Sequence, residues 1–167
     1  MTDTSPNTDR LPMDPDVDVD ESPTGEPRPV HLRVSSLAFV FVGGTVGVAA
    51  REGLTLAVPV VGGFPWVIFA INLAGAFLLG FLLDALVRRG PDHGRRRTLR
   101  LLLGTGFMGG FTTYSALATD TASLFSAGAV GTGIGYSVGT VILGGIATWA
   151  GILVATLTHR PHAEATS

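Results

Sequence analysis

The order of apolar and polar residues divides the chain into four long apolar stretches separated by short polar segments. The stretches cover about residues 34–61, 64–87, 99–126 and 134–157. Each is long enough for a helix to cross the hydrocarbon core of a bilayer, which takes about 20 residues. We therefore predict an all-α membrane protein with four transmembrane helices.

Polar segments flank this apolar region. Residues 1–33 are rich in Asp, Pro and Thr, and such a segment cannot bury enough apolar surface to offset the entropy lost on ordering. We expect a disordered acidic tail there and a second, short polar tail at 159–167. The predicted organisation is one four-helix membrane domain over residues 34–158 between two tails.

The third stretch contains residues that disfavour a continuous helix. Glycine lowers helix propensity, and Thr and Ser side chains can bond the backbone in other ways. We expect a broken helix, which at membrane depth frees backbone groups for an ion site. The alternative is a glycine face that lets a neighbouring helix approach closely. The residues concerned are Gly104, Gly106, Gly109, Gly110, Thr112, Thr113 and Ser115, with the candidate ion site at 109–115.

Polar residues also interrupt the first two stretches. The Asn72 amide suits either a hydrogen bond between helices or donation to an anion that has lost its water. Arg51 and Glu52 lie late in the first stretch, where charges face a partner within the bundle or reach toward the interface. Asp84 lies near the end of the second stretch, and we expect it to pair with an arginine of the next loop.

Charge is concentrated in one loop. Six of the eleven cationic residues, all of them arginine, lie between residues 88 and 100. By the positive-inside rule this loop is cytoplasmic, and four helices then place both termini on the same side of a cell membrane. Membrane helices flank the loop, so a topogenic role with anionic-lipid contact is favoured over nucleic-acid binding.

The sequence lacks the residues that several kinds of functional site require. The chain has no cysteine, which excludes disulfides and thiolate metal sites. The sequence contains no phosphate-binding loop, nucleophile–base pair or cluster of metal-ligating side chains, so we do not expect an enzyme.

Three motifs, in this order, resemble those of the CrcB/Fluc family of fluoride channels. Residues 43–51 (GGTVGVAAR) resemble the family's first-helix pattern GGxxGAxxR. Residues 72–80 (NLAGAFLLG) resemble NxxGxFxxG in its second helix, and residues 104–115 (GTGFMGGFTTYS) resemble the third-helix pattern GxxGGxTTFS. The resemblance covers about residues 37–154, nearly the whole membrane region.

The resemblance implies a passive, fluoride-selective channel that exports fluoride from the cytoplasm. It implies an antiparallel, dual-topology dimer with two fluoride pathways and one central structural Na⁺. By motif position, Gly109 and Thr112 would offer backbone carbonyls to that Na⁺, and Arg51 would lie at the vestibule. The fluoride pathway would comprise Asn72, Thr113, Tyr114, Ser115, Leu117, Tyr136 and Thr140.

The chain departs from the family pattern at two of these positions. Tyr114 and Leu117 stand where the family has phenylalanine, whose ring edges carry partial positive charge toward an anion. Tyr114 keeps a ring and adds a hydroxyl, whereas Leu117 has no ring. We expect an incomplete aromatic box that weakens one of the two pathways.

Two other functions are weighed against a channel. A small proton-coupled exporter would use Glu52 as its exchangeable carboxyl and would lose transport in the variant Glu52→Gln. A membrane assembly subunit would use its glycines for packing alone and would pass no ions.

The uneven distribution of arginine also bears on the partner. An antiparallel homodimer needs one sequence to insert both ways, yet six arginines in one short loop favour a single orientation. We expect a heterodimer with an oppositely oriented homologue, an arrangement that also occurs in the family this chain resembles. A homodimer is the alternative.

Overall fold

The structure, a computed structural model, describes residues 19–20, 28–29, 33–58 and 62–158. The tails predicted at 1–33 and 159–167 fall almost entirely outside the described residues. Within the N-terminal unit, strands β1 (Val19–Asp20) and β2 (Arg28–Pro29) form an antiparallel pair.

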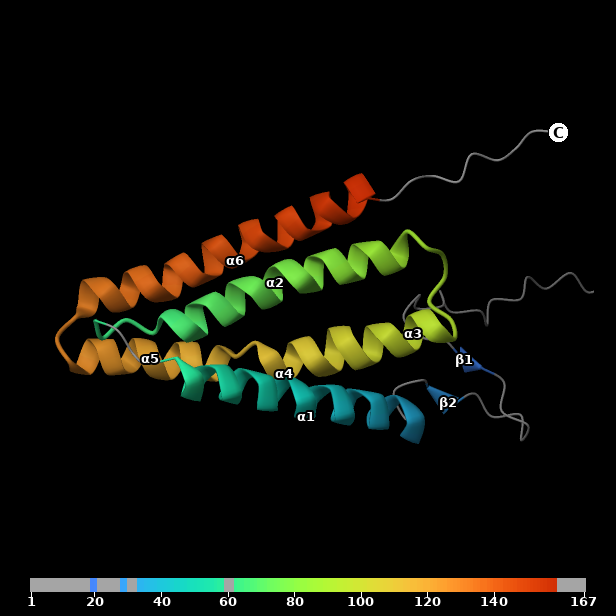
Figure 1. Ribbon diagram of the computed structural model, residues 1–167, viewed down its shortest axis with the longest axis horizontal. Helices are drawn as coiled ribbons and strands as arrows, with labels where there is room; N and C mark the ends of the chain where they lie inside the picture. The colour runs from blue at the N-terminus through green and yellow to red at the C-terminus, as the bar shows by residue number, and fades with distance from the viewer. Residues whose placement is uncertain (1–18, 21–27, 30–32, 59–61, 159–167) are drawn as a thin grey trace, which may run out of the picture. The chain divides into compact units, whose positions relative to one another are not determined.

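The described part of the chain from residue 34 onward consists of helices joined by short connections (Figure 1). Three of its helices are long and apolar enough to cross a membrane, and they correspond to the first, second and fourth apolar stretches. These helices are α1 (Val34–Ala57), α2 (Trp66–Val87) and α6 (Val130–Thr158).

The third apolar stretch is divided into several elements. It begins with α3 (Arg95–Leu99), continues through the π-helical segment η2 (Arg100–Met108) and ends its first half with α4 (Gly109–Phe111). Two extended residues follow, and α5 (Tyr114–Ser126) forms the second half. The chain therefore stays helical through most of the glycines that we expected to interrupt it.

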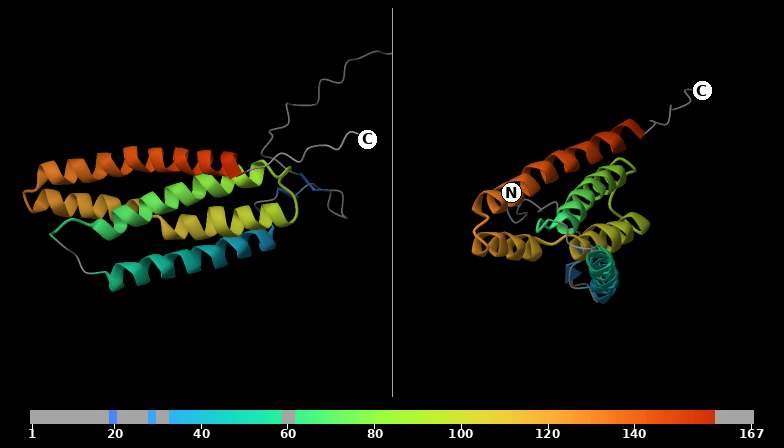
Figure 2. Two further views of the ribbon diagram at one scale, coloured as in Figure 1. Left: turned by 45° about the horizontal axis from the view of Figure 1, so that its top comes forward. Right: turned by 60° about the vertical axis from the view of Figure 1, so that its left-hand side comes forward.

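Helices α2 and α6 run side by side in all the views (Figures 1 and 2). Two glycines permit this close approach. A Cβ at Gly80 would overlap the Thr148 carbonyl oxygen, and a Cβ at Gly151 would overlap that of Phe77. Small residues at such contacts are typical of helix pairs packed within membranes.

A second glycine contact joins α1 to the first half of the third stretch. A Cβ at Gly43 would overlap the carbonyl oxygen of Leu102, and one at Gly47 would overlap that of Phe107. The contact is reciprocal, since a Cβ at Gly110 would overlap the carbonyl oxygen of Gly44. Glycines on both helices therefore bring the two backbones together.

The connection between α5 and α6 is shorter than the 127–133 linker that we expected. Gly128 adopts φ +78°, its N–H donates to the Phe125 carbonyl, and the Ala129 N–H donates to the Leu124 carbonyl. This is a Schellman motif, in which glycine takes the left-handed position that ends a helix. The motif reverses the chain at once, so α6 already begins at Val130.

The predicted pairing of Asp84 with a loop arginine is confirmed. Arg88 Nε donates to Asp84 Oδ2 one turn earlier. Arg88 also donates to the Thr156 hydroxyl at 2.8 Å. This arrangement joins the end of α2 to the end of α6.

Candidate functional site

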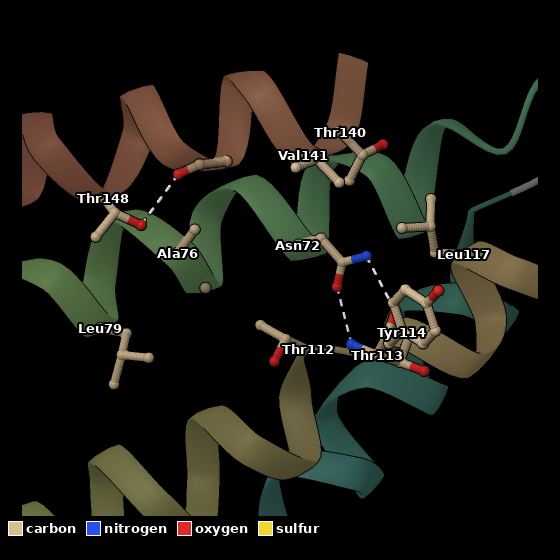
Figure 3. A pocket seen from close by; sticks show the side chains of 12 residues that line it. Asn72, Ala76, Leu79, Thr112, Thr113, Tyr114, Leu117, Thr140, Val141 and Thr148 are labelled. Atoms are coloured by element: carbon tan, nitrogen blue, oxygen red, sulfur yellow. Dashed lines mark hydrogen bonds between the residues drawn. The ribbon is translucent and has the colours of Figure 1, made fainter. Parts of the chain in front are cut away.

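The site centres on the two extended residues between α4 and α5. Thr112 has φ −80° and ψ 155°, and Thr113 has φ −150° and ψ 120°, so neither continues the helix. The Asn72 side chain, from α2, meets this break (Figure 3). Its Nδ2 donates to the Thr113 carbonyl at 3.1 Å, and its Oδ1 accepts from the Thr113 N–H at 2.9 Å.

This pair of bonds affects the hydrogen bonding of the Gly109 carbonyl, which lies one turn before Thr113. In an uninterrupted helix the Thr113 N–H would donate to the carbonyl of Gly109, four residues earlier. Here that N–H donates to Asn72 instead. The bond between Asn72 and Thr113 therefore removes the usual helical donor from the Gly109 carbonyl.

Thr113 also affects the carbonyl of Thr112. Its hydroxyl caps the start of α5 by accepting from the Ala116 N–H at 3.1 Å. That N–H would otherwise donate to the Thr112 carbonyl. The two carbonyls predicted to bind a cation, those of Gly109 and Thr112, thus both lose their regular helical donors.

The break borders a pocket of about 330 Å³ between α2, α5 and α6. Gly75 leaves room for Thr112, because a Cβ there would overlap the Thr112 methyl group. The pocket brings together five of the predicted pathway residues, namely Asn72, Thr113, Tyr114, Leu117 and Thr140. Its other lining residues include Ala76, Leu79, Val141 and Thr148 (Figure 3).

Most hydroxyls near the pocket are already hydrogen-bonded. Thr140 donates to the Tyr136 carbonyl at 2.6 Å, and Thr112 donates to that of Met108 at 2.8 Å. The hydroxyls of Thr113 and Ser115 lie 3.1 Å apart, and one donates to the other. Whichever donates, that pair retains one hydroxyl hydrogen for another acceptor.

Two predicted pathway residues, Ser115 and Tyr136, do not line this pocket. Ser115 lies beside it through its contact with Thr113, whereas Tyr136 is enclosed elsewhere. Tyr136 is only 1% exposed, and its ring packs against Phe64 and Phe69. Its hydroxyl donates to Asp120 Oδ2 at 3.2 Å. No local sequence pattern pairs Asp120 with Tyr136, because the two residues lie on different helices.

A second pocket, of about 510 Å³, lies between α5 and α6. Its lining is mostly apolar and includes Ala118, Phe125 and Val138. Tyr114, Leu117 and Val141 line both pockets. The two positions that depart from the family's phenylalanines therefore lie where the pockets meet.

The charged pair on α1 is less enclosed than the break. Glu52 is exposed, whereas Arg51 is half-buried. The Nε atom of Arg51 is buried and has no hydrogen-bond partner within the described part of the chain. Arg51 follows Gly43 and Gly47 at intervals of four residues, so it lies on the α1 face that contacts the first half of the third stretch.

The glycines of the third stretch do not all pack in the same way. Gly106 and Gly110 contact the α1 backbone, as the packing alternative predicted. Gly109 is exposed, and a Cβ there would meet nothing within 4 Å. The packing face and the open position adjoin the same break.

Comparison with known proteins gives one consistent family. Residues 38–152 match the family described as CrcB-like protein, Camphor Resistance (CrcB). The chain is 53% identical over 124 residues to fluoride-specific ion channel FluC 2 of Leifsonia xyli subsp. xyli, covering 74% of this chain and 86% of that protein. It is 44% identical over 114 residues to FluC 1 of Cutibacterium acnes, covering 68% and 80%. The chain belongs to the CrcB family, as its three motifs predicted.

Proposed function

We propose that this protein is a fluoride-selective passive ion channel, not an enzyme, and that it exports fluoride from the cytoplasm. Relatives covered over at least 80% of their length are named fluoride-specific ion channels. The structural observation that carries the proposal is the Asn72–Thr113 pair of hydrogen bonds. These bonds maintain a break in the helix beside a pocket, where some hydrogen-bond donors still have a hydrogen available for an anion.

The donors suit a small, strongly hydrated anion. A selective path must replace its water with close donors in a narrow space that excludes larger anions. Asn72 retains its second Nδ2 hydrogen, and the Thr113–Ser115 pair retains one hydroxyl hydrogen. Thr140 would have to release the Tyr136 carbonyl before it could donate to fluoride. Arg51, whose Nε has no partner among the described residues, would attract the anion at the vestibule.

The freed carbonyls fit a structural Na⁺. Transporters bind hard cations through the carbonyls of unwound membrane helices. Gly109 and Thr112 supply two such oxygens, each without its regular helical donor. Because Gly109 is exposed, the same carbonyls of a second subunit would complete the coordination at the centre of a dimer.

In the membrane, the elements from α3 to α5 together form the third of four crossings. The break then lies within the bilayer, where irregular backbone is tolerated only if protein buries it or it borders a wet cavity. The second subunit, inserted antiparallel, supplies that cover. The exposed apolar residues of α1 and α6, such as Phe41, Ile146 and Leu157, contact lipid or that partner.

The partner we favour is an oppositely oriented homologue. Six arginines lie between residues 88 and 100, and only Arg51 falls on the opposite side of a four-helix arrangement. That imbalance holds both termini and the arginine loop in the cytoplasm. A homologue with complete phenylalanines would also compensate for Tyr114 and Leu117.

Growth on fluoride tests the function in cells. A bacterial strain that lacks its own fluoride exporter should regain growth on fluoride when it expresses this chain together with an oppositely oriented homologue. Expression of each chain alone is the control. Failure to restore growth with both proteins present in the membrane would contradict the proposal.

A further inference from the structure

We infer that Asn72 is a positioning residue for the cation site. Its hydrogen bonds to Thr113 hold the Gly109 carbonyl out of helical bonding, so a side chain on α2 determines whether that carbonyl can bind Na⁺. This inference rests on the Na⁺ site of the proposed function.

The Thr113 N–H has two possible acceptors, which give different backbones. If it donates to the Gly109 carbonyl, the helix continues and that oxygen is occupied. If it donates to Asn72 Oδ1, as it does at 2.9 Å, that oxygen stays available. The extended conformation of Thr112, with ψ 155°, accompanies the second choice.

Asn72 holds the Thr113 peptide groups on both sides. The bond from Nδ2 to the Thr113 carbonyl at 3.1 Å stops that carbonyl from rotating away. With its backbone held, Thr113 presents its hydroxyl to the Ala116 N–H and so frees the Thr112 carbonyl as well. Asn72 therefore acts on both carbonyls through Thr113: on Gly109 by engaging the Thr113 N–H, and on Thr112 by holding Thr113 in place to cap α5.

The helix that carries Asn72 also limits where the break can lie. Gly75 lies one turn after Asn72 and leaves room for the Thr112 methyl group, which a Cβ at Gly75 would overlap. Asn72 also lines the pocket and retains one N–H toward the anion path. One side chain thus contributes to both the fluoride path and the cation site.

The test compares two variants in the full-length protein, purified in detergent as its functional dimer. Asn72→Leu keeps the branch at Cγ but can form neither bond to Thr113. Thr148→Val is the matched control, because Thr148 lines the same pocket but donates only to Gly144 of its own helix. The measurement is the shift in thermal unfolding midpoint between NaCl and N-methyl-D-glucamine chloride, since a bound ion stabilises the folded state.

We expect a Na⁺-dependent shift in the wild type and in Thr148→Val, and its loss in Asn72→Leu. A merely structural role would lower the midpoint in both salts and leave the shift intact, which would overturn the inference. If Asn72→Leu does not give a monodisperse dimer, Asn72→Ala serves with the same expectation. Absence of a shift in the wild type would overturn both the cation site and this role for Asn72, while fluoride flux would still test the channel separately.

Discussion

Tyr114 and Leu117 lie one helical turn apart on α5, yet Tyr114 is 80% exposed and Leu117 is 6% exposed. Both line the two pockets beside the break. The exposed ring is available to a partner subunit, whereas the leucine side chain is enclosed within its own. Of the two positions only Leu117 lacks an aromatic ring, so we expect the larger effect on a fluoride pathway there.

The variant Leu117→Phe should raise fluoride flux. The larger ring would overpack a closed core, but here it can extend into either of two adjoining pockets and restore a ring edge toward the anion. The measurement is fluoride efflux from liposomes. Tyr114→Phe, which keeps the ring and removes only the hydroxyl, is the matched control and should be tolerated. Lower flux in a folded, dimeric Leu117→Phe protein would show that the position has been repacked.

Gly47→Ala should destabilise the protein by separating α1 from the first half of the third stretch. The added Cβ would overlap the Phe107 carbonyl oxygen, and overpacking of this kind costs about 1–3 kcal/mol. Gly53→Ala on the same helix is the control, because its Cβ would meet nothing within 4 Å. Thermal unfolding in detergent measures the difference, and equal midpoints for the two variants would rule out this tight contact.

The orientation of the subunit can be measured with reporters fused after Ser167. One reporter is active only in the cytoplasm and the other only in the periplasm. Because of the arginines between residues 88 and 100, we expect activity from the cytoplasmic reporter alone. Similar activity from both would indicate dual insertion and favour a homodimer.

Much of the fold could be predicted because it depends on local properties. Length and hydropathy are sufficient to locate α1, α2 and α6. The position of the break was harder to predict. Gly104, Gly106 and Gly110 favour interruption by propensity, but the chain remains helical there because Gly106 and Gly110 pack on α1. Tertiary contact overrode propensity, and the extended backbone is confined to Thr112 and Thr113.

The contacts that organise the site are long-range and left no local signal. Asn72 and Thr113 are 41 residues apart in sequence, so the sequence marks each as an unusual polar residue without indicating that they pair. For Asn72 it left open an interhelical bond or an anion donor. The structure shows the interhelical bond, and within the described part of the chain Asn72 uses only one of its two N–H groups. The bond between Tyr136 and Asp120 was missed for the same reason.

Ion efflux from liposomes measures whether the protein is a passive, fluoride-selective channel. The wild-type protein and its oppositely oriented partner are reconstituted in liposomes that enclose fluoride. Efflux is followed with a fluoride electrode. A parallel measurement uses chloride. We expect rapid fluoride efflux without a proton gradient and far slower chloride efflux. Equal rates for the two anions, or fluoride efflux that requires a proton gradient, would contradict the proposed function.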